Sequence, residues 1–318
     1  MNRDTVSLVT GGAGFIGSHV VDRLLALGHD VRVIDNLSTG HERNLAHVAS
    51  DIEFFRADLR DGDACRRAVQ GVDTVYHVAA LPSVPRSLAD PWESHDANVN
   101  ATMRLLLACG DAGVRRIVYS GSSSTYGDTP TLPKVEAAEP LPRSPYAAAK
   151  LAGEQYVLAF ARAGILEGVA LRYFNVFGPR QDPDSPYAAV IPAFLKSAYR
   201  GETAHVHGDG RQTRDFTYVS NVVDANILAA GAEGAVGSVV NVGAGQRTSL
   251  LALLDLVREV TGGGLSHEYL PPRPGDVADS LAGLDRAAHV LGYRPSVSLR
   301  EGLELTWRWF QDAREQAS

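Results

Sequence analysis

The sequence has little cysteine, no long apolar run and no excess of positive charge, and each shortage excludes a class of protein. Its two cysteines, Cys65 and Cys109, do not form a metal-ligand spacing, so we expect buried thiols in a reducing compartment. A net charge of −7 argues against nucleic-acid binding as the main function. No apolar segment has the length of a membrane span or the features of a secretory signal, which predicts a cytoplasmic protein with no membrane partner.

The sequence also lacks a recognisable metal-binding motif. The ten histidines are scattered and show no zinc-binding spacing, so we expect no metal site. His77 ends an apolar segment and is interpreted as a core or site-wall residue, not a ligand. The 45% hydrophobic and 21% charged residues are typical of a soluble globular enzyme.

The first half of the sequence alternates short β-branched runs with amphipathic segments, such as 17–27 and 99–112. This alternation predicts a doubly wound parallel sheet of the Rossmann type. Proline, glycine and polar residues become more frequent after Tyr173 and indicate a smaller, discontinuous C-terminal substrate lobe. We expect a dinucleotide-binding domain at 1–172 with about 217–242, and the lobe at about 173–216 and 243–318. The expected strands are 7–10, 30–35, 52–56, 74–78, 116–120, 168–172 and 239–242.

A glycine loop follows the first expected strand. Gly11, Gly12, Gly14 and Gly17 satisfy two related dinucleotide-binding spacings. Glycines allow a tight turn and let the backbone approach a pyrophosphate at the helix N-terminus. Such a loop alone is equally compatible with a tight turn that binds nothing.

Three neighbouring features favour the dinucleotide interpretation. Asp35 ends the second strand, where a carboxylate would bind adenosine ribose hydroxyls and repel a 2′-phosphate. Asp58 and Leu59 follow the third strand, where they could meet the adenine. His77 precedes Val78, Ala79 and Ala80, which are small enough for backbone to pass close to a flat cofactor. Together these features predict NAD rather than NADP.

A tyrosine and a lysine one helical turn apart are the candidate acid–base pair. Tyr146 and Lys150 share one helix face, and the lysine charge is expected to lower the tyrosine pKa from about 10. The tyrosine could then take a proton from an alcohol beside a hydride acceptor. A hydroxyl cluster, Ser122–Thr125, precedes the pair and could also be only a polar strand end.

These features occur together with several longer motifs. The sequence resembles the extended short-chain dehydrogenase/reductase family, specifically the UDP-glucose/UDP-N-acetylglucosamine 4-epimerase group, over nearly its whole length. The stretches 122–128 and 132–136 are most similar to members that act on UDP-N-acetylhexosamines. The motifs that carry the resemblance are 10–17, 35–40, 84–87, 122–127, 146–150, 172–178, 208–215 and 273–276.

The resemblance implies a catalytic set and a reaction. Tyr146 would be the base for the sugar C4 hydroxyl, Lys150 would assist it and hold the nicotinamide ribose, and Ser122 would relay the proton. Ser123 and Ser124 remain possible substitutes for Ser122. Oxidation at C4, rotation of the 4-keto sugar and reduction on its other face would invert C4 without net oxidation. The further cofactor-binding residues that the resemblance implies are Phe15, Ile16, Asn36, Ser38, Gly40 and Tyr173.

A UDP-sugar substrate is also implied. Arg214 and Arg273 could neutralise its diphosphate, although an arbitrary arginine is usually part of a surface salt bridge. Asp276 could bind a ribose diol. Further substrate contacts are expected from the hexose-side residues Ser83, Val84 and Ser123, from Asn175, and from Ala189, Val190 and His207 beside the uracil.

Other reactions of the family are less consistent with the sequence. Related dehydratases and decarboxylases carry a carboxylate in the hydroxyl cluster, where this chain has Ser123 and Ser124. UDP-glucuronic acid 4-epimerases usually have a threonine where this chain has Asn175 and a basic residue where it has Asp182. An aspartate near the sugar carboxylate would repel it, so we rank that activity second. A non-catalytic NAD-binding regulator is a further alternative, against which the presence of Tyr146 counts.

One position bears on the choice of sugar, and two helices bear on assembly. Ser280 stands four residues after Asp276, where the family limits sugar width, and serine would leave room for an N-acetyl group; it could also be a small turn residue.

The helices near 99–112 and after Tyr146 correspond to the four-helix bundle of family homodimers. Their apolar residues, which could equally face the sheet, are Val99, Leu105–Leu107, Leu151, Tyr156, Val157 and Phe160.

Overall fold

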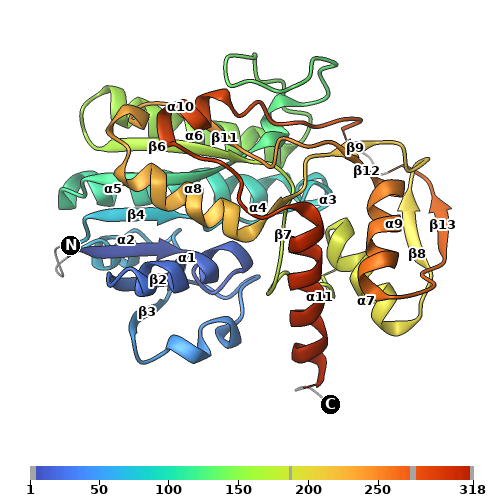
Figure 1. The fold of residues 1–318 in the computed structure, drawn as a ribbon. Helices are drawn as coiled ribbons and strands as arrows, with labels where there is room; N and C mark the ends of the chain where they lie inside the picture. The colour runs from blue at the N-terminus through green and yellow to red at the C-terminus, as the bar shows by residue number, and fades with distance from the viewer. Residues whose placement is uncertain (1–4, 186–187, 273–276, 316–318) are drawn as a thin grey trace.

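The computed structural model describes residues 5–185, 188–272 and 277–315. Its centre is a seven-stranded parallel sheet in the order β11-β6-β5-β4-β1-β2-β3 (Figure 1). All seven strands were predicted from the sequence, because each is a short apolar run between turn residues. They are β1 (Val6–Thr10), β2 (Asp30–Asp35), β3 (Ile52–Arg56), β4 (Thr74–His77), β5 (Arg116–Ser122), β6 (Glu167–Tyr173) and β11 (Val239–Val242).

Helices cover both faces of this sheet, which confirms the doubly wound fold (Figure 1). Apolar residues of α1 (Phe15–Ala26) and α8 (Val219–Gly231) form one buried cluster with the sheet. Those of α2 (Gly62–Ala68), α5 (Ala101–Ala112) and α6 (Pro145–Arg162) belong to a second cluster. The remaining short helices here are η1 (Glu42–Asn44), η2 (Ala46–Val48), α3 (Val84–Ala89), α4 (Pro91–His95), the π-helical turn η3 (Asp96–Asn100), η4 (Ser123–Tyr126), η5 (Glu233–Ala235) and α10 (Asp285–Leu291).

The later segments form a group at one end of the sheet, where Figure 1 shows α7, α9, β8 and β13 together. Three two-stranded ladders pair β7 with β10, β8 with β13, and β9 with β12. The proposed domain boundaries at 172, 216 and 242 stay a prediction. The elements are β7 (Val176–Phe177), α7 (Val190–Arg200), β8 (Ala204–His207), β9 (Thr213–Arg214), β10 (Thr217–Tyr218), β12 (Thr248–Ser249), α9 (Leu250–Thr261), β13 (His267–Leu270) and α11 (Leu299–Glu315).

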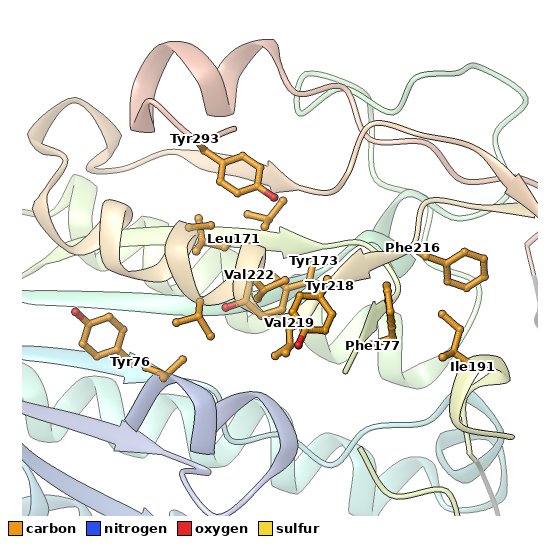
Figure 2. Close-up of a cluster of buried hydrophobic side chains, with 14 of the residues drawn as sticks. Tyr76, Leu171, Tyr173, Phe177, Ile191, Phe216, Tyr218, Val219, Val222 and Tyr293 are labelled. Atoms are coloured by element: carbon orange, nitrogen blue, oxygen red, sulfur yellow. The ribbon is translucent and has the colours of Figure 1, made fainter. Parts of the chain in front are cut away.

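One buried cluster runs from the sheet into this second group. Figure 2 shows the cluster running from Leu171 of β6 through Tyr218 to Phe177, Ile191 and Phe216, which come from the later segments. Burial of this shared apolar surface stabilises the arrangement by roughly 25 cal/mol for each Å² removed from water. No helix among the described residues combines the length and apolar character that crossing a bilayer requires.

The two cysteines and the residues expected at a dimer interface differ in their exposure to solvent. Cys65 and Cys109 are free and buried, as predicted. Of the apolar residues expected on a dimer surface, Val99, Leu105, Leu106 and Val157 are instead buried within the chain, and the last three belong to the apolar cluster of α2, α5 and α6. Leu107 and Tyr156 do reach solvent.

Candidate active site

The glycine loop between β1 and α1 leaves room only for backbone. A Cβ on Gly17 would lie 2.1 Å from the Gly11 carbonyl oxygen, and Gly11 itself has φ +69°. Gly14 is the N-cap of α1 and supplies no side chain to the first helical N–H groups. These donors and the positive end of the helix dipole therefore suit an anionic group such as a dinucleotide pyrophosphate.

Two carboxylates stand at the ends of neighbouring strands beside this loop. Asp35 accepts hydrogen bonds from the backbone N–H groups of Ala13 (3.0 Å) and Leu37 (2.7 Å), while burial raises its pKa. Burial also raises the pKa of Asp58, but hydrogen bonds from Arg60 and Asn36 outweigh it and lower that pKa to about 2. Both carboxylates therefore hold the loops in place and remain available to hydroxyl or amino donors.

A cavity of about 620 Å³ opens at the carboxyl ends of these strands and is here called the larger cavity. The glycine loop can hold the pyrophosphate of NAD, and the cavity volume is large enough for the dinucleotide. Most of the predicted cofactor-binding residues lie in the cavity wall. Gly40 is an exception, since it packs against Ala13 and supports the glycine loop. The predicted cofactor residues in the wall are Gly11, Gly14, Phe15, Ile16, Gly17, Asp35, Asn36, Ser38, Asp58, Leu59, Val78, Ala79, Ala80, Tyr146, Lys150 and Tyr173.

Helix α6 brings Tyr146 and Lys150 to the same cavity. Its start is fixed by Ser144, whose side chain accepts a hydrogen bond from the Ala147 N–H at 3.2 Å, and by Pro145 in the first turn. From there the two side chains lie one helical turn apart, and both line the larger cavity, as expected from their spacing.

The ionisation of this pair differs from the sequence expectation. Burial raises the pKa of Tyr146 to about 12, against a smaller opposite effect of a side-chain hydrogen bond with Ser122. Burial also lowers the pKa of Lys150 to about 7. The expectation that Lys150 lowers the Tyr146 pKa is therefore wrong for the protein alone, because desolvation disfavours the charged form of each group.

The serine cluster lies between β5 and the turn that follows it. The Ser122 and Ser124 hydroxyls are 2.8 Å apart, and Ser122 also contacts Tyr146 through its side chain. Ser122 in addition caps the short helix η4 by accepting from the Ser124 N–H at 3.2 Å. Ser122 therefore combines a structural role with a position suitable for proton relay. Ser123 starts η4, and neither Ser122 nor Ser123 lines either of the two cavities described here.

His77 is a satisfied core residue, as predicted. Its ring nitrogens lie 2.8 Å from the Thr10 hydroxyl and 2.9 Å from the Thr102 hydroxyl. Burial lowers the pKa of His77 to about 3, so the imidazole is neutral near pH 7. Within the described residues no group of His, Cys, Asp or Glu side chains could hold a metal ion.

A second, smaller cavity of about 220 Å³ lies among the later segments. Ala189 belongs to the walls of both cavities, so the two adjoin at the start of α7. Ser83 lines the larger cavity, and Val84 begins α3 beside it but lies outside the wall. The predicted substrate residues that line the smaller cavity are Asn175, Ala189, Val190, His207 and Arg214.

Ser280 stands behind Asn175 and outside both cavity walls. Its buried hydroxyl accepts from the Asn175 side-chain amide at 3.2 Å and from the Asp215 N–H at 3.5 Å. Its proposed contact with the hexose stays a prediction. Arg273 and Asp276, also predicted to bind substrate, lie outside the described residues.

The larger cavity also contains charged residues that sequence reasoning missed. Arg60 lies in its wall and contacts Asp58 at 2.9 Å, Glu93 at 3.1 Å and Asp96 at 3.5 Å. Its position two residues after the recognised Asp58 was an available signal. Arg180 is a second such residue and pairs with Asp22 of α1 at 2.8 Å, a contact that no local pattern indicates.

The fold and site define a class, an NAD-dependent enzyme with a Rossmann-type sheet and a tyrosine–lysine pair at its carboxyl edge. Residues 7–243 match the model of the NAD dependent epimerase/dehydratase family. The chain belongs to this family, which confirms the predicted family, cofactor and enzyme class.

Individual relatives agree with this assignment. A UDP-glucose 4-epimerase of Mycolicibacterium smegmatis is 41% identical, over 96% of this chain and 98% of the relative. A UDP-N-acetylglucosamine 4-epimerase structure from Methanobrevibacter ruminantium has 39% identity and a TM-score of 0.93, with 98% and 100% coverage. A UDP-glucuronic acid 4-epimerase structure from Bacillus cereus, in complex with UDP-glucuronic acid and NAD, has 31% identity and a TM-score of 0.91, with 97% and 100% coverage.

Proposed function

We propose that this chain catalyses the NAD-dependent C4 epimerisation of a UDP-hexose. The observation that carries the proposal is the pair Tyr146 and Lys150 in the wall of the cavity with the glycine cradle, with Ser122 in contact with Tyr146, next to a second cavity that contains Arg214. NAD held in the glycine cradle would supply the hydride acceptor and donor for sugar C4. The chain's own residues must then move one proton and let the sugar turn.

Proton transfer is assigned to Tyr146 and Ser122. In its phenolate form Tyr146 accepts the C4 hydroxyl proton, and Ser122, whose hydroxyl contacts Tyr146, hydrogen-bonds the same sugar hydroxyl and helps to pass the proton to the phenolate. Lys150 is buried beside them, and in its charged form it favours the phenolate. The proton returns along the same path when the C4 hydroxyl re-forms.

We assign binding of the UDP part of the substrate to the smaller cavity. Arg214 is nearly buried, and its Nη1 donates to the carbonyl oxygens of Thr213 (2.9 Å) and Ala278 (3.1 Å), which orients the guanidinium. An oriented arginine suits a diphosphate, and His207 and Val190 in the same wall suit the uridine. Firm binding of UDP leaves the hexose free to present either face at Tyr146.

Among sugars, we propose UDP-GlcNAc and UDP-GalNAc as substrates, with UDP-Glc and UDP-Gal also accepted. The support is a small side chain at Ser280, packed against Asn175 of the substrate cavity. The absence of a carboxylate at positions 123 and 124 disfavours dehydration and decarboxylation, which need an acid or base there.

UDP-glucuronic acid 4-epimerisation is the second candidate, favoured by the solved relative that binds that substrate. Two features of this chain oppose it. Asp182 and Asp184 both lie in the wall of the larger cavity, where their charge would repel a sugar carboxylate. Asn175 donates its amide to Asp215 and Ser280, which leaves it less able to hold an anionic group.

The test is incubation of the purified protein with UDP-GlcNAc, UDP-Glc or UDP-glucuronic acid, followed by separation of the C4 epimers. We expect UDP-GalNAc and UDP-Gal to form with no net NADH. Conversion of UDP-glucuronic acid alone would replace the proposed substrate with the second candidate. If no sugar is epimerised, the proposed function is refuted and a non-catalytic role becomes the better explanation.

The cytoplasmic location and the homodimer stay predictions. Leu107 of α5 and Tyr156 of α6 are exposed apolar residues on the two helices expected to form the four-helix bundle. Both lie on elements that pack against each other, so one continuous surface could contain them. Sedimentation of the purified chain would establish the assembly.

A further inference from the structure

Lys150 is an unusual cation in this chain. Only three of the 30 basic residues are lysines, namely Lys134, Lys150 and Lys196. Lys150 is 3% exposed, so its ammonium has lost most of the water that would stabilise its charge. A buried ammonium requires a compensating partner if it is to act as a cation beside Tyr146.

Tyr119 of β5 contacts Lys150 at both ends of that residue. The Lys150 Nζ atom lies over the Tyr119 ring, 4.7 Å from its centroid. The Tyr119 hydroxyl donates a hydrogen bond to the backbone carbonyl of Lys150 at 3.1 Å. One side chain therefore fixes the backbone of Lys150 and also presents an electron-rich face to its charge.

Helix α6 has a glycine, Gly153, at the point where it meets the Tyr119 side chain. A Cβ on Gly153 would lie 2.4 Å from the Tyr119 hydroxyl oxygen and 2.9 Å from its ring carbon Cζ. Any larger residue at position 153 would therefore push the phenol away from α6. The fit of Gly153 to Tyr119 is independent of the contacts with Lys150 and indicates the same arrangement.

Three other polar groups near Lys150, on Glu154, His77 and Tyr146, do not duplicate the contact between the Tyr119 ring and the Lys150 ammonium. Glu154, one turn further along α6, favours the charged lysine, but its carboxylate is shared with Arg172 in a buried pair at 2.7 and 2.8 Å. His77 of β4 is neutral, and its ring lies 5.6 Å from that of Tyr119. Tyr146 faces the same region from α6 and is protonated in the free protein.

We propose that Tyr119 is a positioning residue that holds Lys150 in place and stabilises its charge through the face of its ring. This inference deepens the proposed function, on which the role of Lys150 in catalysis rests. The contact itself is a property of the protein and is measurable without any sugar substrate. It assigns a role to a strand residue whose side chain does not line either cavity.

The experiment measures the titration of Lys150 directly. Carbon-13 labelling of the lysine side chains gives signals from three residues, and a Lys150→Arg variant identifies the one that belongs to Lys150. Tyr119→Met removes the aromatic face and refills the space with a flexible side chain. We expect the Lys150 titration midpoint to fall by about one pH unit, a tenfold change in proton affinity.

Two further variants separate the ring from the hydroxyl. Tyr119→Phe keeps the aromatic face, and we expect it to change the midpoint little. Pentafluorophenylalanine at position 119 has nearly the same shape as phenylalanine with a reversed ring quadrupole, and it should lower the midpoint relative to Tyr119→Phe. This pair tests the proposal even if Tyr119→Met does not fold.

Tyr76→Met is the matched control, because Tyr76 is a buried tyrosine on the adjacent strand β4, among the apolar side chains of Figure 2. It should leave the Lys150 midpoint unchanged. An equal shift in Tyr76→Met, or no difference between phenylalanine and its pentafluoro analogue, would overturn the proposal. Because no sugar is present, either result is distinguishable from a failure of the epimerase assignment.

Discussion

The two cavities differ in how the chain builds their walls. The larger one lies at the carboxyl ends of parallel strands, and its wall combines strand ends with the starts of α1 and α6 and with connecting segments such as the one around Arg180. The smaller one is enclosed by α7, short strands of two to four residues and connecting segments that are distant in sequence. The groups assigned to chemistry therefore stand on the central sheet and α6, while those assigned to substrate recognition stand on segments that only the complete fold brings together.

The largest effect should come from the larger cavity. Tyr146→Phe removes the proposed base and leaves the ring in place, so we expect turnover to fall at least about 10³-fold. The glycine cradle is untouched, so NAD binding should remain within about twofold of the wild type. Steady-state kinetics and a titration with NAD measure the two quantities separately.

A matched control is Tyr173→Phe, since the Tyr173 hydroxyl is already bonded to Ser120 and Asn226 inside the core. It should lose far less activity than Tyr146→Phe. If Tyr146→Phe turned over at the wild-type rate, the assignment of the base would be wrong.

A smaller and more selective effect is expected on the substrate side. Ser280→Tyr places a ring where the serine hydroxyl now bonds Asn175, and it should lower kcat/KM for UDP-GlcNAc about 100-fold. The decrease for UDP-Glc should be tenfold or less, because that sugar has no N-acetyl group to accommodate.

Ser280→Ala is the control for the lost hydrogen bonds, since it removes the hydroxyl and keeps the space. It should retain most activity on both sugars. Full activity of Ser280→Tyr on the N-acetylated pair would show that Ser280 is only a small turn residue.

The smallest effect concerns the buried charge. An unfolded lysine keeps its proton to about pH 10.4, whereas folded Lys150 releases it above about pH 7. Between these values the unfolded chain binds more protons, so this residue makes the free energy of unfolding rise with pH. From pH 7 to 8 the wild type should gain about 1 kcal/mol relative to Lys150→Met.

Denaturant unfolding at the two pH values measures this difference. Lys196→Met provides a comparison, because Lys196 is a partly exposed lysine paired with Asp184 at 3.0 Å. It should show the wild-type pH dependence. A parallel response of the wild type and Lys150→Met would mean that Lys150 does not titrate in this range.

The sheet and the cofactor side were predictable because their signals are local. Each strand is an apolar run, and Gly17 must be glycine because its own loop passes 2.1 Å from the position of a Cβ. The ring contact of Tyr119 and the pair of Arg180 with Asp22 were not predictable, since each joins residues from different elements. The Tyr146 pKa was predicted in the wrong direction because burial, which a sequence does not show, disfavours the phenolate.

The position of β11 has a consequence for how the protein is made. This strand pairs with β6 at the edge of the large sheet, yet it is synthesised only after α7, β8 and α8. Until residue 242 has left the ribosome, the seven-residue, largely buried strand β6 lacks its outer neighbour and exposes an edge able to pair with other chains. A fragment that ends at residue 172 should therefore aggregate, and successful truncations will need to retain the chain beyond β11.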